Sequence, residues 1–295
     1  MPTSGEPPTR SRSPADNAQL ALLLEVAGTP KPGNVDRHRD LEDLRFEHFL
    51  ASTVGVRPGL EMAANGAAIG PAFERAVEGM ATQRGGNTQF GCLLLLVPLL
   101  VASRRDLAPP VVESVVEETT VADAACFYRA FEQVDVYVTA PPDDLEPLDV
   151  RRGSEAIPDL EARGLTLFDI LEKSVPGDDV AREWTTGFER TFDAATKLAA
   201  LPEDRPLADR GAEVFLSLLA DRPDTLIEKR HGKAAAAKVT REATALLESD
   251  ALWSDRDAVE RFADDLVERG HNPGTTADIT AAALFVALER GAVDV

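Results

Sequence analysis

Apolar residues recur three and four positions apart along most of the chain, and this spacing predicts amphipathic helices. The predicted helical segments are residues 16–27, 41–50, 57–80 with a break near 66–71, 91–102, 109–131, 178–199, 208–219, 233–248, 254–268 and 278–288, and helical spacing also resumes at Thr166. The only clear alternation of apolar and polar side chains covers residues 134–139, which predicts one short strand or an extended connector. The pattern therefore predicts an all-α fold.

Three predicted helices carry cap signals at their first residues. Asp16 and Asp40 each precede an apolar run, so we expect them to be N-caps. Thr275 and Asp278 have the spacing of a capping box, with aspartate in place of glutamate.

The composition of two segments differs from that of the helices. Residues 1–14 are rich in proline, serine, threonine and arginine without an apolar run, so we expect a disordered tail and not a signal peptide. Residues 141–164 are rich in proline, aspartate and arginine, which is typical of a surface excursion. The chain is 44% apolar, so we expect residues 15–295 to form a single large helical domain.

The most apolar run is too short to cross a membrane. It covers residues 92–102 and contains Pro98, whereas a membrane span needs about 20 apolar residues. The two cysteines, Cys92 and Cys126, have neither the number nor the spacing of a disulfide framework or a zinc site. These features predict a cytoplasmic protein with no membrane partner.

The net charge of −20 arises from 51 acidic and 31 basic residues, and only six of the basic residues are lysines. An acidic, lysine-poor surface resembles that of proteins from high-salt cytoplasm, where salt screens the repulsion between like charges. Nucleic-acid binding depends on clusters of Lys and Arg at the phosphates, and the sequence has no basic stripe. We therefore expect a halophilic protein that does not bind nucleic acid.

Residues 29–40, which we call the opening loop, follow a predicted helix containing Glu25. Two prolines and a glycine within this loop prevent both helix and ladder pairing, so it must be a fixed loop. Its charged residues include Lys31, Asp36, Arg37 and His38. An ordinary connector with solvated charges is the alternative interpretation.

Three further stretches could help to bind an anion. Residues 85–88 and 273–276 each place glycine at a helix start, where exposed amides attract negative charge, although plain capping explains such starts equally well. Residues 224–233 combine Asp224 with several cations, which alternatively favour the negative pole of a helix end. Three of the six lysines lie in this stretch or the opening loop. A polyphosphate ligand with Mg²⁺ fits such clusters of carboxylates and cations. We therefore expect the opening loop and these three stretches to converge on one pocket.

The same stretches resemble the motifs of triphosphoribosyl-dephospho-CoA synthases. The resemblance rests, in order along the chain, on Glu25 with Thr29 to Arg37, Gly86-Asn87-Thr88-x-x-Gly91, Asp224-Thr225 through Arg230 to Gly232, and Pro273-Gly274-x-x-Ala277-Asp278. It implies that the ribose 2′-hydroxyl of dephospho-CoA attacks C1′ of the ATP ribose, which releases adenine. ATP and dephospho-CoA, or a related nucleotide acceptor, are then the expected partners, and a homodimer is compatible with the resemblance.

The resemblance also suggests roles for individual residues. The catalytic candidates are Glu25, Asp36 and Asp224. The candidates for binding phosphate or other substrate groups are Lys31, Arg37, His38, Asn87, Thr88, Lys229, Arg230, Gly274 and Thr275. The candidate Mg²⁺ ligands are Asp36, Asp43 and Asp278.

The sequence departs from the family pattern at two places. Gln89-Phe90 stands where the family has His-Lys, and a family His-x-Asp is matched only by Leu41-x-Asp43. Two alternatives therefore stay open. One is a ribosyl or phosphoribosyl transferase, or a nucleotide N-glycosyl hydrolase, with another acceptor. The other is a non-catalytic helical scaffold that binds nucleotide.

Overall fold

The helices expected from the apolar spacing form the whole framework of the protein. The computed structural model describes residues 12–295, and within this range the only strand-like pairing is a single bridge between Asp36 and Arg39. The all-α prediction is confirmed. Val134 is in a bend and residues 135–140 have no regular secondary structure, so the segment is a connector and not a strand.

The chain is a succession of short helices joined by turns and loops. The first part forms α1 (Pro14–Ala27), α2 (Phe46–Gly55), α3 (Arg57–Ala64), α4 (Ile69–Met80), α5 (Phe90–Ser103), α6 (Pro109–Glu117) and α7 (Val121–Ala130). The middle forms the 3-10 helices η1 (Asp143–Leu148), η2 (Val150–Ala156) and η3 (Val175–Gly177), together with α8 (Ile157–Arg163), α9 (Leu167–Ser174), α10 (Asp179–Thr185) and α11 (Glu189–Ala200). The last part forms α12 (Leu207–Asp221), α13 (Thr225–His231), α14 (Lys233–Glu248), α15 (Ala251–Ser254), α16 (Arg256–Glu268) and α17 (Gly274–Glu289).

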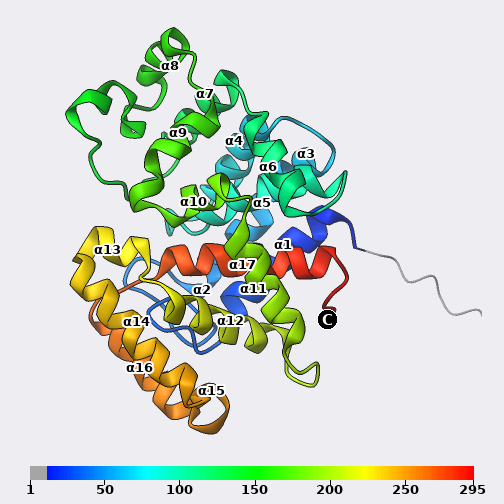
Figure 1. The fold of residues 1–295 in the computed structure, drawn as a ribbon, viewed down its shortest axis with the longest axis vertical. Coiled ribbons are helices and arrows are strands. Elements are labelled where there is room, and N and C mark those ends of the chain that lie inside the picture. Colours follow the sequence, from blue (N-terminus) through cyan, green and yellow to red (C-terminus); the bar gives the residue numbers. More distant parts are fainter. Residues whose placement is uncertain (1–11) are drawn as a thin grey trace, which may run out of the picture.

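Helix α17 is the central element of the fold. Its residues from Ile279 to Leu288 are all buried, as expected for a helix that is apolar on every side. It packs against α1, α5, α10, α11, α12 and α13. In Figure 1, α17 crosses the middle of the molecule, with α7 to α9 on one side and α14 to α16 on the other. The main core runs from Ala15 to Val293, so helices from both ends of the described chain share it.

Helix α5 is the apolar run that the sequence suggested as a core helix, and nearly all of it is buried. Pro98 lies inside it and has no N–H to donate to the carbonyl of Leu94, four residues earlier. The indole Nε1 of Trp184 on α10 donates to that carbonyl at 3.1 Å. A side chain from another helix thus satisfies the acceptor that the proline leaves without a partner.

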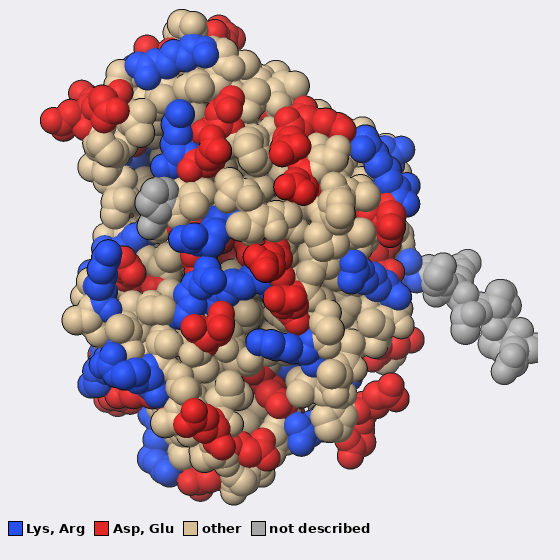
Figure 2. Space-filling view, viewed as in Figure 1, with Lys and Arg blue, Asp and Glu red and all other residues tan. Residues whose placement is uncertain are grey.

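Among residues 12–295, no helix is both long enough and apolar enough to span a bilayer. On the face shown in Figure 2, Lys and Arg form separate groups between acidic and uncharged surface.

Some predicted boundaries and caps were wrong. Helix α1 begins two residues before the expected cap Asp16, because the Ser13 hydroxyl accepts from the Asp16 amide while the Asp16 carboxylate accepts from the Ser13 amide. The last residues of the predicted tail 1–14 therefore enter the fold, whereas residues 1–11 lie outside the described part. The single domain predicted for residues 15–295 stays a prediction.

The segment after the opening loop also differs from its prediction. Residues 41–45 are not helical, because Asp40 accepts from the amide of Phe46 and the Leu41 amide bonds to the Leu44 carbonyl. Both leucines pack with Val26, Val35 and Phe49 in a small separate cluster. Their three-residue spacing therefore arises from a folded loop.

Residues 141–164, the predicted surface excursion, contain η1, η2 and α8, and η2 and α8 pack against α7. One further expectation needs correction. Thr275 and Asp278 do not form a capping box, because Pro273 is the N-cap of α17. Their side chains contact Thr225 and Cys92 instead.

Candidate active site

One cavity of about 620 Å³ brings together the four stretches that the sequence singled out. Its wall includes Glu25 and Asn34 near the opening loop, residues 85–88, Lys229 and Arg230 on α13, and residues 274–278 at the start of α17. These segments are up to about 250 positions apart in the chain, so only the tertiary fold brings them together. The predicted convergence of the four stretches on one pocket is confirmed.

The predicted site residues divide into two groups. Those that line the cavity are Glu25, Asp43, Asn87, Thr88, Lys229, Arg230, Gly274, Thr275 and Asp278. Those that are not part of its wall are Lys31, Asp36, Arg37, His38 and Asp224. Arg37 forms an ion pair with Asp209 on α12, and His38 is exposed.

Asp36 organises the opening loop from within. It is fully buried, and one carboxylate oxygen accepts from the Thr29 hydroxyl at 2.9 Å and the Lys31 amide at 3.0 Å. That oxygen also pairs with the Arg39 guanidinium, and the other accepts from the His38 amide at 2.8 Å. Both oxygens are therefore engaged by the loop itself. This placement does not support the catalytic and metal-binding roles predicted for Asp36, and makes it a positioning residue.

The opening loop is held against the segment before α17. Gly33 has φ = +73°, and a Cβ at this position would lie 2.1 Å from the carbonyl oxygen of His271. Only glycine permits both this conformation and this approach. The contact lets Asn34 donate to the Asn272 side chain at 2.8 Å.

Lys31 and Glu25 form a buried ion pair at the cavity wall. The Lys31 ammonium also donates to Asn34 Oδ1 at 3.1 Å. Burial raises the pKa of Glu25, while the neighbouring Lys31 ammonium opposes that rise. Glu25 is thus a buried carboxyl that faces the cavity, is more basic than a surface glutamate and is oriented by a lysine behind it.

Asp278 is the second carboxyl in the cavity wall, and its side chain is half-buried. Its nearest polar partner is the Cys92 thiol, with Sγ 3.1 Å from Oδ1. Burial raises the pKa of Asp278 to about 8, because the hydrogen bond from Cys92 only partly opposes desolvation. At neutral pH this carboxyl therefore holds a proton. A Cβ at Gly91 would lie 2.1 Å from Asp278 Oδ2, so the glycine makes room for the carboxyl.

Asp224 ties α13 to α17. It is the N-cap of α13, where Oδ1 accepts from the amides of Leu226 and Ile227. Its Oδ2 accepts from both the amide and the hydroxyl of Thr276 at 2.8 Å. Because four donors occupy the carboxylate and it is absent from the cavity wall, this placement does not support the predicted role of Asp224 as a base.

We expect Asp224→Ala to lower the free energy of unfolding by about 2–4 kcal/mol, because it removes a helix cap and the two hydrogen bonds to Thr276. Denaturant unfolding measures this loss. Asp255→Ala is the matched control, since Asp255 caps α16 through a single bond to Ala258, and it should cost about 1 kcal/mol. A loss for Asp224→Ala no larger than that of the control would contradict the structural role.

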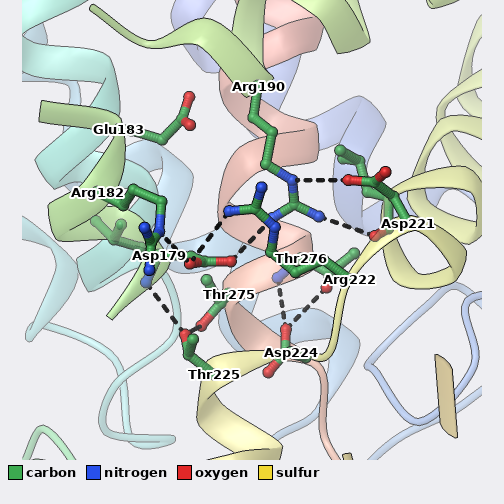
Figure 3. Close-up of polar contacts among 12 residues, drawn as sticks. Asp179, Arg182, Glu183, Arg190, Asp221, Arg222, Asp224, Thr225, Thr275 and Thr276 are labelled. Atoms are coloured by element: carbon green, nitrogen blue, oxygen red, sulfur yellow. Dashed lines mark hydrogen bonds and ion pairs between the residues drawn. The ribbon is translucent and has the colours of Figure 1, made fainter. Parts of the chain in front are cut away.

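An arginine cluster behind the cavity fixes the helix starts that face it. Figure 3 shows the carboxylate of Asp179 between Arg182, Arg190 and Arg222, at 3.0, 3.2 and 3.6 Å. The Asp179 amide donates to the Thr225 hydroxyl, which lies 3.1 Å from the hydroxyl of Thr275. This network joins the starts of α10, α13 and α17, and the three arginines provide the cationic partners that a buried carboxylate needs.

Two cations from the last turn of α13 reach the cavity. The Lys229 ammonium lies 2.6 Å from Asp178 Oδ2, and the Arg230 guanidinium lies over the Tyr137 ring at 4.7 Å. The Tyr137 hydroxyl donates to the Lys229 carbonyl at 3.2 Å. The connector between α7 and η1 is thereby fastened to α13.

The acidic residues of the wall fit Mg²⁺ only together with a phosphate ligand. Within residues 12–295, no three His, Cys, Asp or Glu side chains are grouped as a metal site. Mg²⁺ commonly uses one or two carboxylates and completes its coordination with phosphate oxygens and water. Asp43 and Glu42 are exposed carboxylates at the wall and suit this arrangement.

Several wall residues were missed by the sequence analysis. Asn34 lies in the quoted motif of the opening loop and Asn272 directly precedes the motif that begins at Pro273, but neither was singled out. Asp178 and Cys92 are brought to the site only by tertiary packing. The side chains of Gln89 and Phe90, which depart from the family pattern, lie in different surroundings. The Gln89 side chain bonds to Ser52 and Thr53 away from the cavity, whereas Phe90 is part of its wall.

The comparisons with known proteins agree with the geometry. Residues 11–294 match the model of the CitG family, described as ATP:dephospho-CoA triphosphoribosyl transferase. The crystal structure of a proposed triphosphoribosyl-dephospho-CoA synthase from Archaeoglobus fulgidus is similar, with a TM-score of 0.65 and 25% sequence identity. The similarity covers 82% of this chain and 99% of that chain. This chain therefore belongs to the CitG family of ATP:dephospho-CoA triphosphoribosyl transferases.

Proposed function

We propose that this protein transfers the triphosphoribosyl group of ATP to the ribose 2′-hydroxyl of dephospho-CoA and releases adenine. The observation that carries the proposal is a pair of carboxyls, the buried Glu25 and the half-buried Asp278, in one cavity with Lys229 and Arg230. Glycosyl transfer needs a proton acceptor, a proton donor and cations for the phosphates, and the cavity has a candidate for each. Family membership favours this reaction over the hydrolase and scaffold alternatives.

The two carboxyls differ in protonation and so suit opposite roles. Glu25 is paired with a lysine and accepts the proton of the attacking 2′-hydroxyl, while that oxygen bonds to C1′. Asp278 is protonated at neutral pH and donates to the adenine nitrogen as the C1′–N bond breaks. The net change moves one proton from the acceptor hydroxyl to adenine. Glu25 ends protonated and Asp278 ionised, and exchange with solvent restores both.

We assign the triphosphate to the polar residues of the cavity wall. Lys229 and Arg230 supply charge, while Asn87, Thr88 and the first amides of α17 near Gly274 and Thr275 supply hydrogen bonds. Mg²⁺ bound to the phosphates would neutralise part of their charge, and Asp43 is the protein ligand proposed for it. Arg37 and His38 lie outside the wall, so we give them no contact with substrate.

Incubation with ATP, Mg²⁺ and dephospho-CoA at high KCl, followed by mass spectrometry, tests the reaction. We expect equal amounts of adenine and of dephospho-CoA enlarged by the triphosphoribosyl group. Adenine without any acceptor product would identify a hydrolase, and a thermal shift with ATP but no adenine would identify a binding protein. Parallel assays without Mg²⁺ and at low salt test the metal and the halophilic character. The cytoplasmic location and a homodimer stay predictions.

We expect Lys229→Met to raise the KM for ATP about tenfold or more, because a hydrogen bond to a charged phosphate contributes about 1.5–3 kcal/mol. Steady-state kinetics with varied ATP measures the change. Lys233→Met is the matched control, because Lys233 is exposed near the same helix and is absent from the cavity wall. An unchanged KM in Lys229→Met would remove Lys229 from the phosphate site.

A further inference from the structure

One side of the cavity lacks the charged and polar side chains that bind a triphosphate. It is apolar, and its residues come from α5, α7, α9, α10 and neighbouring segments, here called the apolar wall. The members of the apolar wall are Leu94, Phe127, Phe131, Val136, Val138, Val150, Ile170, Leu171, Val180 and Ala181. Figure 1 shows α7, α9 and α10 on the opposite side of α17 from α14 and α16. A charged phosphate here would lose its hydration without gaining a partner.

The connector along the apolar wall has free backbone groups. Residues 135–138 form no helix, strand, turn or bend and line the cavity, and among residues 12–295 no hydrogen bond reaches their backbone amides or carbonyls. Only the Tyr137 hydroxyl in this segment forms a hydrogen bond, to Lys229. Backbone amides and carbonyls without partners can pair with the amides of an extended ligand, as in strand addition.

We propose that the apolar wall and residues 135–138 hold the pantetheine arm of dephospho-CoA. This inference rests on the proposed function. The arm is long and extended, has two amides for the connector backbone, and presents methyl and methylene groups to the apolar wall. Adenine is less suited to this place, because the rings of Phe90, Phe127 and Phe131 pack on one another at 5.0–6.1 Å instead of offering a free stacking face.

The position of Tyr137 connects the arm to the phosphate side. Its ring contacts the Arg230 guanidinium and its hydroxyl bonds to the Lys229 carbonyl, so the connector meets the cationic turn of α13. In dephospho-CoA the arm is joined directly to a pyrophosphate. An arm along residues 135–138 therefore places its pyrophosphate beside the two cations that also face the triphosphate. Lys229 and Arg230 are then shared between the two substrates, and the acceptor follows one continuous path.

Aspartate substitution at Val136 or Val138 tests the subsite. Both side chains are half-buried on an irregular segment, which tolerates a carboxylate better than a helix core does. The probes are dephospho-CoA and ADP, since ADP has the same adenosine diphosphate and 2′-hydroxyl but no arm. We expect kcat/KM for dephospho-CoA to fall about 10- to 100-fold, whereas the value for ADP and the KM for ATP stay within about twofold.

Thr139→Asp is the matched control, because Thr139 is the exposed next residue and does not line the cavity. It should leave both acceptors unchanged. An equal loss for dephospho-CoA and ADP, a raised KM for ATP, or no loss in either variant would overturn the subsite.

Calorimetry separates the subsite from the reaction. In the wild-type protein we expect dephospho-CoA to bind more tightly than ADP, and Val138→Asp to abolish this difference. If the difference and its loss are present but no transfer occurs, the proposed function fails and the subsite stands. If transfer occurs and both acceptors bind equally, the subsite fails and the function stands.

Discussion

Asp278→Asn is expected to lower kcat about 10²- to 10⁴-fold, the usual loss when a general acid is removed. Asparagine keeps the shape of the side chain and can still accept from the Cys92 thiol, but it has no carboxyl proton for adenine. In the wild-type protein the same group should make activity decline above about pH 8, where Asp278 ionises. Rates of adenine release across pH 5–9 measure both effects, and that decline should be absent from the residual activity of the variant.

The same substitution should stabilise the protein at neutral pH. The folded-state pKa of Asp278, about 8, is raised above its ordinary value of 3.8 first by burial and then by Glu25, Asp224 and Asp178. Between these values the folded protein retains a proton that the unfolded chain loses, so wild-type stability falls as pH rises from about 4 to 8. Asparagine removes this dependence. We expect the variant to gain on the order of 2–4 kcal/mol relative to wild type at pH 7, and almost nothing at pH 4.

Glu289→Gln is the matched control for Asp278→Asn. Glu289 is another carboxyl of α17 whose pKa is raised by burial, but it bonds to Asn17 and is not part of the cavity wall. It should retain full turnover. Wild-type kcat in Asp278→Asn would refute the role as acid, and an unchanged slope of stability against pH would refute the raised pKa.

The helices were predictable because their period is local. Helix α14 begins and ends at the expected residues, Lys233 and Glu248. Residues 41–45 were mistaken for helix because nothing local reveals that Asp40 bonds to the Phe46 amide. The order within residues 141–164 depends on distant contacts such as the bond from the Tyr128 hydroxyl to the Leu148 carbonyl. Contacts of this kind leave no periodic trace in the sequence.

The site was predictable as a set of stretches and not as a set of side chains. The convergence of the four stretches on one pocket was predictable because the family motifs occur in the same order along this chain. Membership of a motif does not tell which carboxylate faces the cavity. Asp36 and Asp278 were both predicted as metal ligands, yet the carboxylate oxygens of Asp36 accept hydrogen bonds from backbone amides of its own loop. Asp278 remains at the wall because Gly91 on another helix leaves it room. The number of hydrogen-bond donors around a carboxylate depends on the tertiary structure and cannot be read from the sequence.

Lys31→Met is expected to lower the free energy of unfolding by about 3–5 kcal/mol, because it leaves the Glu25 carboxylate buried without its cation. Methionine fills most of the lysine volume, so the loss reports charge more than packing. Denaturant unfolding at high KCl measures it. Arg75→Met removes an exposed pair with Glu78 and should cost no more than about 1 kcal/mol.

The double variant Glu25→Gln/Lys31→Met separates folding from catalysis at this pair. Removing both charges leaves no uncompensated ion, so we expect it to regain at least about half of the stability lost in Lys31→Met. Turnover should not return, because the amide of the substituted glutamine cannot accept the proton of the 2′-hydroxyl. Recovery of stability without activity assigns Glu25 to the chemistry and Lys31 to its orientation. If turnover returns together with stability, Glu25 is not the base and the pair only holds the opening loop.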